Sequence, residues 1–113
     1  MAEPRTEAGP VFRVILRMEV NPGMEPEFEE TWTDIAGAVA RDPANLGQWL
    51  MRGCDGPSVY YVVSDWRDKA AFGEFERGEA HCEHRARLRP LRHGGWMITA
   101  EVVHTIAGQS VPA

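Results

Sequence analysis

The sequence predicts one α+β domain with the ferredoxin-like order β-α-β-β-α-β, in which helices cover one face of a four-stranded antiparallel sheet. Residues 11–20 alternate between apolar and polar side chains, as in a half-buried strand. Two further strand-like segments flank the turn at residues 55–57. Segments with helical spacing follow the first and third strands, which completes the order.

The first strand spans residues 11–20, and its apolar face holds Phe12, Val14, Leu16, Met18 and Val20. The turn at 21–23 leads into a helix from about Glu25 to Arg41. Pro26 is tolerated in the first turn of that helix, where acidic residues also favour its start. An apolar stripe along this helix predicts core packing and consists of Phe28, Trp32, Ile35 and Val39.

The second and third strands span residues 46–54 and 58–66, and the short turn between them predicts an antiparallel hairpin. A second helix starts near Asp68 and is interrupted at Gly78, and a third runs from about Glu79 to Leu88. The fourth strand spans 96–106, after Pro90 and two glycines. We expect a single domain over 1–113 with its core at 11–106, a flexible arm at 1–10 and a tail at 107–113.

No predicted helix remains to cover the second face of the sheet. Its candidate apolar residues are Ile15, Trp49, Met51, Tyr61, Val63, Met97 and Val103. A second copy of the chain would cover such a face, so a homodimer is expected.

Composition excludes several classes of protein. The 113 residues carry a net charge of −5, which argues against a nucleic-acid binder. No apolar run approaches the roughly 20 residues that a membrane-spanning helix needs, and the N-terminal residues lack the apolar stretch of a signal peptide. We therefore expect a cytoplasmic protein with no membrane partner. Cys54 and Cys82 are then expected to be thiols.

The segment His81-Cys82-Glu83-His84 offers two imidazoles, a thiol and a carboxylate. A closed zinc site takes four ligands, usually from separated segments, so we predict no metal site here. The sequence also has no glycine-rich phosphate loop and no dinucleotide fingerprint. No cofactor is therefore predicted.

His84 lies on an apolar stripe with Ala80, Leu88 and Leu91, which points it towards the sheet. It is either a core histidine bonded to a backbone carbonyl or a base that projects into a cavity. His81, one position off the stripe and flanked by arginines, is expected at the cavity mouth.

The third strand ends in Trp66, and Tyr60 and Ser64 share its face. Together with the histidines they would give an aromatic pocket with a few polar groups, as is typical of a small-molecule site. Alternatively, the Trp66 ring plugs the open end of the core. Both interpretations of Trp66 remain open at this point.

Several segments resemble the antibiotic biosynthesis monooxygenase family. The third strand, Trp66, "RDKAAF", the broken helix and "HCEHRARL" resemble one family segment, and "NPGMEPEFEETW" is similar to the family's turn into its first helix. The resemblance covers about residues 11–106. It implies a dimeric α+β barrel, with two ferredoxin-like sheets packed face to face, and a pocket lined by Trp66.

The resemblance also implies an activity. Family members oxygenate aromatic polyketides, such as an anthrone to a quinone, without flavin, haem or metal, and the substrate itself is the reductant. We therefore expect a cofactor-independent monooxygenase of antibiotic or pigment biosynthesis. The catalytic candidates are His84, Trp66 and His81, and the substrate-binding candidates are Tyr60, Ser64, Phe72 and Arg87.

Three positions depart from the family pattern. Anthrone-oxidising relatives have Asn and Tyr where this chain has Val62 and Phe72, and haem-degrading relatives hold iron with a His where it has Glu76. Haem degradation is thus disfavoured. A polyketide cyclase or aromatase of the same fold remains an alternative. So does a non-catalytic pathway partner, whose basic helix face would dock an acidic acyl carrier protein.

Overall fold

The computed structural model describes residues 9–110, so most of the expected N-terminal arm and the end of the expected tail lie outside it. The sheet contains β1 (Phe12–Val20), β2 (Asn45–Arg52), β3 (Val59–Trp66) and β4 (Arg92–Glu101). The strands are antiparallel, in the order β2-β3-β1-β4.

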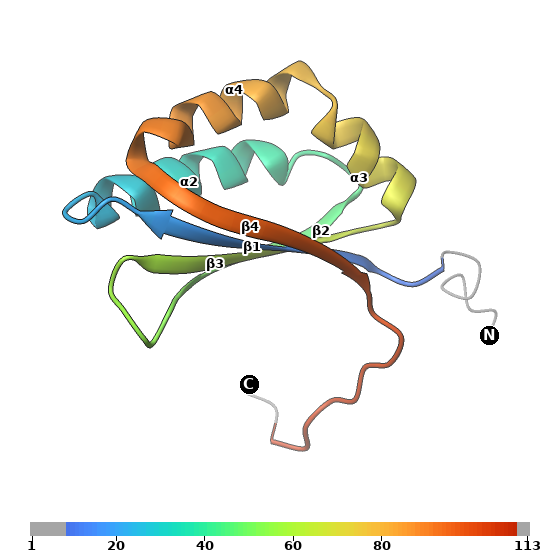
Figure 1. Ribbon diagram of the computed structural model, residues 1–113. Coiled ribbons are helices and arrows are strands. Elements are labelled where there is room, and N and C mark those ends of the chain that lie inside the picture. The colour runs from blue at the N-terminus through green and yellow to red at the C-terminus, as the bar shows by residue number, and fades with distance from the viewer. Residues whose placement is uncertain (1–8, 111–113) are drawn as a thin grey trace.

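Helix α2 (Glu25–Val39) follows β1, and three elements connect β3 to β4: α3 (Lys69–Glu76), α4 (Glu79–Leu88) and the 3₁₀ turn η1 (Arg89–Leu91). All helices lie on one face of the sheet (Figure 1). The predicted ferredoxin-like order with a broken second helix is therefore confirmed. In the described part of the chain, no helix is both long enough and apolar enough to cross a membrane.

The core lies between the sheet and the helices. The alternating inner side chains of β1 and β3 are buried there, against apolar residues of α2, α3 and η1. The central members are fully buried, with 0% exposure for Val20 and Phe28 and 1% for Tyr60 and Trp66. The period-two pattern of β1 thus determines which residues face the helices.

Strand β4 differs from its expected bounds at both ends. It begins at Arg92, because the two glycines that suggested a break pair with β1 instead. Gly95 has a φ of +147°, and a Cβ there would lie 2.0 Å from the Arg17 carbonyl oxygen. β4 ends at Glu101, opposite the first residue of β1, and a last bond joins the Val102 N–H to the Val11 carbonyl at 3.0 Å. The other bounds differ from expectation by two residues or fewer.

The face opposite the helices is uncovered in the single chain and carries exposed apolar residues beside two ion pairs, Arg13–Asp65 and Arg17–Glu19. Trp49 and Trp96 are each 48% exposed there, and Tyr61 and Trp96 contact each other with ring centroids 6.4 Å apart. Two expected members of this face are wrong. Met97 pairs with Leu16 and lies on the helix side, so its neighbours Trp96 and Ile98 belong to the outer face instead. Val103 lies beyond the end of β4 and is 78% exposed.

Candidate active site

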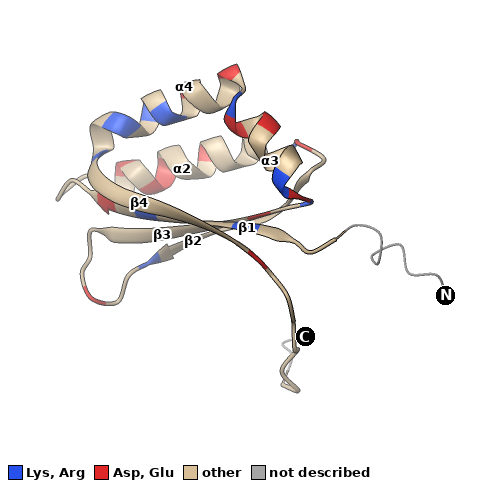
Figure 2. Ribbon diagram, turned by 45° about the vertical axis from the view of Figure 1, so that its right-hand side comes forward, with Lys and Arg blue, Asp and Glu red and all other residues tan. Residues whose placement is uncertain are grey.

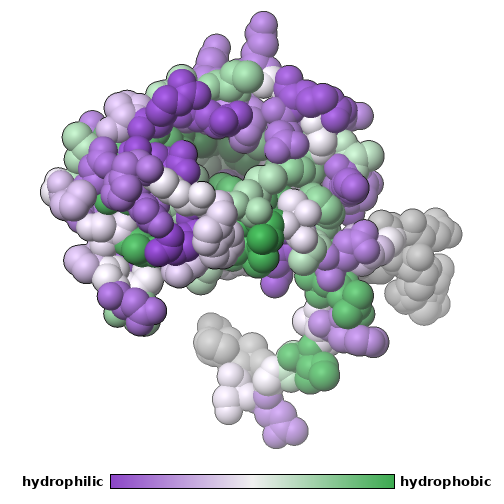
Figure 3. Space-filling model, viewed as in Figure 1, coloured by the Kyte–Doolittle hydropathy of each residue, from purple (hydrophilic) through white to green (hydrophobic). Residues whose placement is uncertain are grey.

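A cavity of about 410 Å³ lies between the sheet and helices α3 and α4. Its apolar lining includes Val14, Leu16 and Met18 of β1, Phe72 and Phe75 of α3, and Met97 of β4. Its polar side chains include Ser64, Glu76, His81, Arg85, Arg89 and Arg92. The surface is hollowed at this place, with hydrophilic residues along the helix side and apolar residues inside (Figure 3). The volume lies within the range of small-molecule sites.

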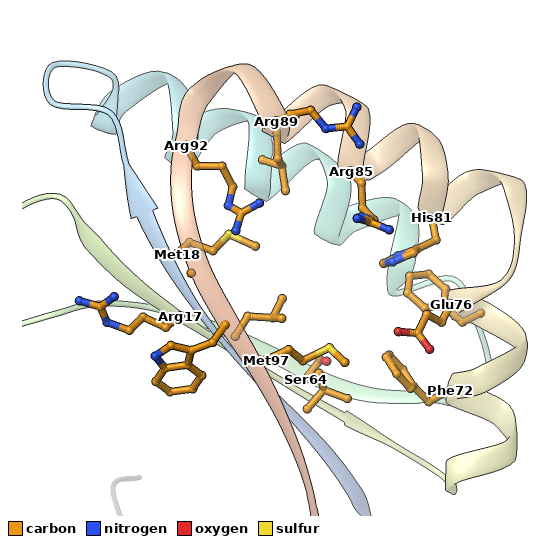
Figure 4. A pocket seen from close by; sticks show the side chains of 16 residues that line it. Arg17, Met18, Ser64, Phe72, Glu76, His81, Arg85, Arg89, Arg92 and Met97 are labelled. Carbon is orange, nitrogen blue, oxygen red and sulfur yellow. The ribbon is translucent and has the colours of Figure 1, made fainter.

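The spacing of residues on α4 decides which side chains reach the cavity. His81, Arg85 and Leu88 lie at i, i+4 and i+7, so they share one helix face. Pro90 and the turn η1 then return the chain to the sheet, and Arg92 enters the same cavity from the start of β4. Figure 4 shows His81, Arg85 and Arg92 around the hollow.

Helix α3 supplies the aromatic wall. Asp68 caps this helix, because its Oδ1 accepts a hydrogen bond of 2.8 Å from the Ala71 N–H. The cap fixes the start of the helix and directs Phe72 and Phe75 inwards. The cavity is therefore apolar on its sheet and α3 sides and polar along α4.

His81 is the histidine that lines the cavity, and its ring lies edge-on to Phe75 with centroids 5.0 Å apart. Burial lowers the pKa of His81 below its usual 6.5, Arg85 lowers it further, and Glu76 acts in the opposite direction. A lowered pKa keeps the imidazole neutral at pH 7. His81 thus has the protonation state that a general base requires.

His84 does not line the cavity, so the expectation that it projects into one is wrong. It lies on the side of α4 that faces α2, where Arg87 and Asp34 form an ion pair of 2.8 Å. Burial lowers the pKa of His84, and Arg87 adds to that effect, against Glu83 and Asp34. Among the described residues, the buried Nδ1 of His84 has no hydrogen-bond partner. A catalytic role for His84 stays a prediction.

Trp66 lies behind the cavity wall rather than in it. The ring is 1% exposed and packs against Phe72 and Phe75, at centroid distances of 5.5 Å and 4.7 Å. Its Nε1–H donates a hydrogen bond of 3.0 Å to the Ser64 Oγ. Trp66 therefore closes the end of the core and supports three residues that line the cavity. Its expected place in the pocket lining is wrong.

The expected substrate-binding residues divide into two pairs. Ser64 and Phe72 line the cavity. Tyr60 instead packs on Phe28, at a centroid distance of 4.9 Å, and its hydroxyl donates to Glu29. Burial and the Glu29 contact raise the pKa of Tyr60. Arg87 is held by Asp34 at the α2–α4 contact, so neither Tyr60 nor Arg87 belongs to the cavity.

The polar residues of the cavity that sequence reasoning missed include Glu76, Arg85, Arg89 and Arg92. The available pattern was the spacing from His81 through Arg85 to Arg89, four residues at each step. An arginine-rich helix is usually interpreted as a solvated face, which concealed this pattern. Figure 2 shows several Lys or Arg positions, in blue, along α4.

No other cluster in residues 9–110 suggests a second chemistry. No group of three or more His, Cys, Asp or Glu side chains there is arranged to hold a metal ion. Cys54 and Cys82 are both free and exposed.

Comparison with known proteins agrees with this architecture. The sequence model for antibiotic biosynthesis monooxygenases matches residues 11–87. A heme oxygenase (mycobilin-producing) of Mycobacterium tuberculosis is 35% identical over 94 residues, which span 80% of this chain and 88% of that protein. A 42.8 kDa protein in the whiE locus of Streptomyces coelicolor is 27% identical over 75 residues, 66% of this chain but only 19% of that protein.

Among solved structures, a point mutant of SnoaB, a cofactor-independent oxygenase from Streptomyces nogalater, superposes with a TM-score of 0.80. The match covers 88% of this chain and 100% of that one, at 22% sequence identity. At that identity the likeness shows a shared fold.

Proposed function

Because the chain belongs to the antibiotic biosynthesis monooxygenase family, we propose that it is a cofactor-independent monooxygenase that oxidises an aromatic polyketide intermediate in the cavity beneath α4. The anthrone-to-quinone type of reaction, in antibiotic or pigment biosynthesis, fits it best. The observation that carries this proposal is one neutral imidazole, His81, held over an apolar and aromatic surface. The likeness to SnoaB, a cofactor-independent oxygenase, supports the same reaction class.

The first step in this proposal is proton removal. His81 accepts a proton from the acidic CH₂ of the substrate, whose rings lie on Phe72, Phe75 and the sheet. The negative charge that develops on the substrate oxygen is stabilised by the neighbouring guanidinium of Arg85. An apolar floor strengthens that charge interaction, because little water competes with it.

The second step consumes oxygen. The carbanion transfers electrons to O₂ and forms a carbon–hydroperoxide bond, and the protonated His81 returns its proton. Loss of water from the hydroperoxide leaves the carbonyl, so one O₂ converts the CH₂ group to C=O and one H₂O. The substrate supplies all the electrons, and the protein supplies a base, a cation and an apolar site.

Other polar residues of the cavity take the place of the Asn and Tyr that anthrone-oxidising relatives have at the positions of Val62 and Phe72. Val62 is buried in the core and Phe72 is part of the aromatic wall, so neither offers a hydrogen bond. Ser64, Glu76, His81 and the arginines are the polar groups present. The proposal therefore assigns the base to α4 rather than to β3.

The test is oxygen uptake by purified, metal-free protein with a panel of anthrones and naphthacenones. We expect one O₂ consumed per quinone formed. Ring closure without oxygen uptake would instead identify the protein as a cyclase or aromatase, and binding without turnover as a non-catalytic partner.

Haem degradation is the second candidate, favoured by the 35% identical heme oxygenase. Haem would be the substrate, with its iron facing a histidine of α4, although this chain has Glu76 where haem-degrading relatives have their iron-binding histidine. Titration with haemin, followed by its absorbance, separates the two candidates. A saturable one-to-one complex that loses iron under a reductant and O₂ would place haem first. We expect no such iron release.

We further propose that the protein is a homodimer joined through the outer sheet face. Trp49, Met51, Trp96 and Ile98 are between 44% and 51% exposed there, and a contiguous apolar surface of this kind is unusual on a monomer. A second copy would bury that face and leave the cavities on the two outer sides of the assembly.

A further inference from the structure

The polar side of the cavity carries more positive charge than the proposed reaction needs. Arg85 and Arg89 project from successive turns of α4 and η1, and Arg92 enters from β4 (Figure 4). Across residues 9–110, none of these three guanidinium groups has a carboxylate within 4.0 Å, although Arg87 between them is paired with Asp34. Three unpaired cations at one cavity favour an anionic ligand.

Arg92 is the best-defined of the three. Its Nη2 donates a hydrogen bond of 3.1 Å to the Gly94 carbonyl, which fixes the guanidinium against the start of β4. Its Nε is buried and has no hydrogen-bond partner among the described residues. A buried, unpaired N–H is costly, so a ligand oxygen that accepts it would be favoured. The planar guanidinium is suited to a carboxylate, which it binds through two parallel hydrogen bonds.

The two ends of the cavity differ in charge. His81 and Arg89 are eight residues apart on continuous helix, or about 12 Å along its axis. Glu76 lies at the His81 end together with Phe72 and Phe75, and Arg85 lies beside His81, whereas Arg89 and Arg92 lie towards the other end. A carboxylate is repelled by Glu76 and attracted by Arg89 and Arg92. An elongated aromatic acid would thus enter in one orientation, with its reacting ring near His81.

We propose that the ligand of this cavity is a planar aromatic carboxylic acid, whose carboxylate is bound by Arg92 with Arg89 while its rings lie on the apolar floor. The inference rests on the proposed function in taking this cavity as the substrate site. It adds the charge of the substrate and its orientation.

The test is a binding comparison that needs no turnover. Isothermal titration with anthraquinone-2-carboxylate and with the uncharged anthraquinone-2-carboxamide measures the contribution of the charge on the same ring system. We expect the acid to bind about 10- to 100-fold more tightly, the usual range for hydrogen bonds to a charged group. Its Kd should weaken as salt increases, and that of the amide should not.

Variants locate the contact. Arg89→Met with Arg92→Met should reduce the preference for the acid to less than about threefold, because methionine keeps much of the side-chain volume without the charge. Arg41→Met, outside the cavity, is the matched control and should keep the full preference. Far-ultraviolet circular dichroism checks folding. If the double variant does not fold, the salt dependence of the native protein decides.

A second pair of ligands, haemin and its dimethyl ester, separates two sources of the carboxylate. If the protein preferred haemin to its dimethyl ester but showed no preference between the two anthraquinones, the arginine contact would be supported and the ligand would be a tetrapyrrole acid. Equal affinity of the native protein for acid and neutral partner in both pairs would overturn the inference. Failure of oxygen uptake, by contrast, would overturn the proposed reaction and leave an observed acid preference intact.

Discussion

His81 and His84 are one turn apart on α4 and meet different surroundings. His81 faces the cavity beside Phe75, whereas His84 faces α2 near the Arg87–Asp34 ion pair. We therefore predict that His81→Ala lowers turnover by about 10²–10⁴, the usual range for loss of an acid–base group. His84→Ala should keep turnover per folded molecule and change mainly the melting temperature. Steady-state kinetics with thermal unfolding separates these outcomes, and equal turnover losses would refute the assignment.

The lowered pKa of His81 gives a second residue-scale prediction, on pH. The base works when neutral, so turnover should be complete at pH 7 and fall as the pH drops through a midpoint below 6.5. A pH–rate profile of kcat/KM measures that midpoint. A midpoint above 6.5 would mean that Glu76 stabilises the protonated ring more than burial disfavours it.

The same shift affects stability, with a sign that follows from proton binding. The unfolded chain binds a proton to this histidine more readily than the folded chain does. The contribution of His81 to stability is thus present above pH 6.5 and is lost as the pH falls from 6.5 towards the folded pKa.

At the scale of the element, α3 depends on its cap. Asp68→Ala removes the acceptor for the Ala71 N–H and should lower the free energy of unfolding by about 0.5–2 kcal/mol. Because α3 carries Phe72 and Phe75, a frayed start should also raise KM. Urea denaturation and kinetics measure the two effects. Asp68→Asn is the control, since an asparagine oxygen can cap the helix in the same way. If Asp68→Asn lowered the free energy of unfolding as much as Asp68→Ala does, the result would argue against the cap.

Gly95 is where β4 passes closest to β1. Gly95→Ala should lower the free energy of unfolding by at least about 2 kcal/mol, because the added Cβ meets the Arg17 carbonyl oxygen and φ is +147°. Gly37 is the control position for Gly95. It is exposed in α2, and nothing lies within 4 Å of a Cβ added there. Gly37→Ala should instead stabilise by about 0.5–1 kcal/mol. Denaturant titration of both variants checks the opposite signs.

The sequence could predict elements better than the site because the two depend on different information. The alternation in β1 and the spacing of Phe28, Ile35 and Val39 in α2 report which face is buried, and both predictions hold. The sequence of α4 does not decide which of its faces is turned towards the sheet. Leu88 belongs both to the stripe through His84 and to the stripe through His81. Only the position of α2 decides between them. The end of β4 likewise depends on where β1 begins.

At the scale of the whole molecule, the uncovered sheet face predicts a homodimer. Light scattering should give about twice the chain mass of 12.6 kDa, with an interface of roughly 1,200–2,000 Å². Ile98→Glu places a charge on the outer face and should give a folded monomer, because Ile98 is 51% exposed in the single chain. Ala38→Glu, on the exposed side of α2, should remain a dimer. A native protein of about 12.6 kDa at micromolar concentration would contradict this arrangement.

The cavity lies on the opposite side of the sheet from that face, between one chain's own helices and strands. Loss of the dimer in Ile98→Glu should therefore affect turnover only through stability. We propose that the reaction takes place inside each chain, where one neutral imidazole, an apolar floor and a guanidinium convert substrate and O₂ without another redox group.

Oxygen consumption by metal-free protein with an anthrone, in native protein and in His81→Ala, tests that claim most directly. Our account predicts one O₂ consumed per quinone formed by the native protein and a rate about 10²–10⁴ lower in a folded His81→Ala variant. Equal oxygen uptake by the two proteins, or none above the uncatalysed rate in the native one, would contradict it.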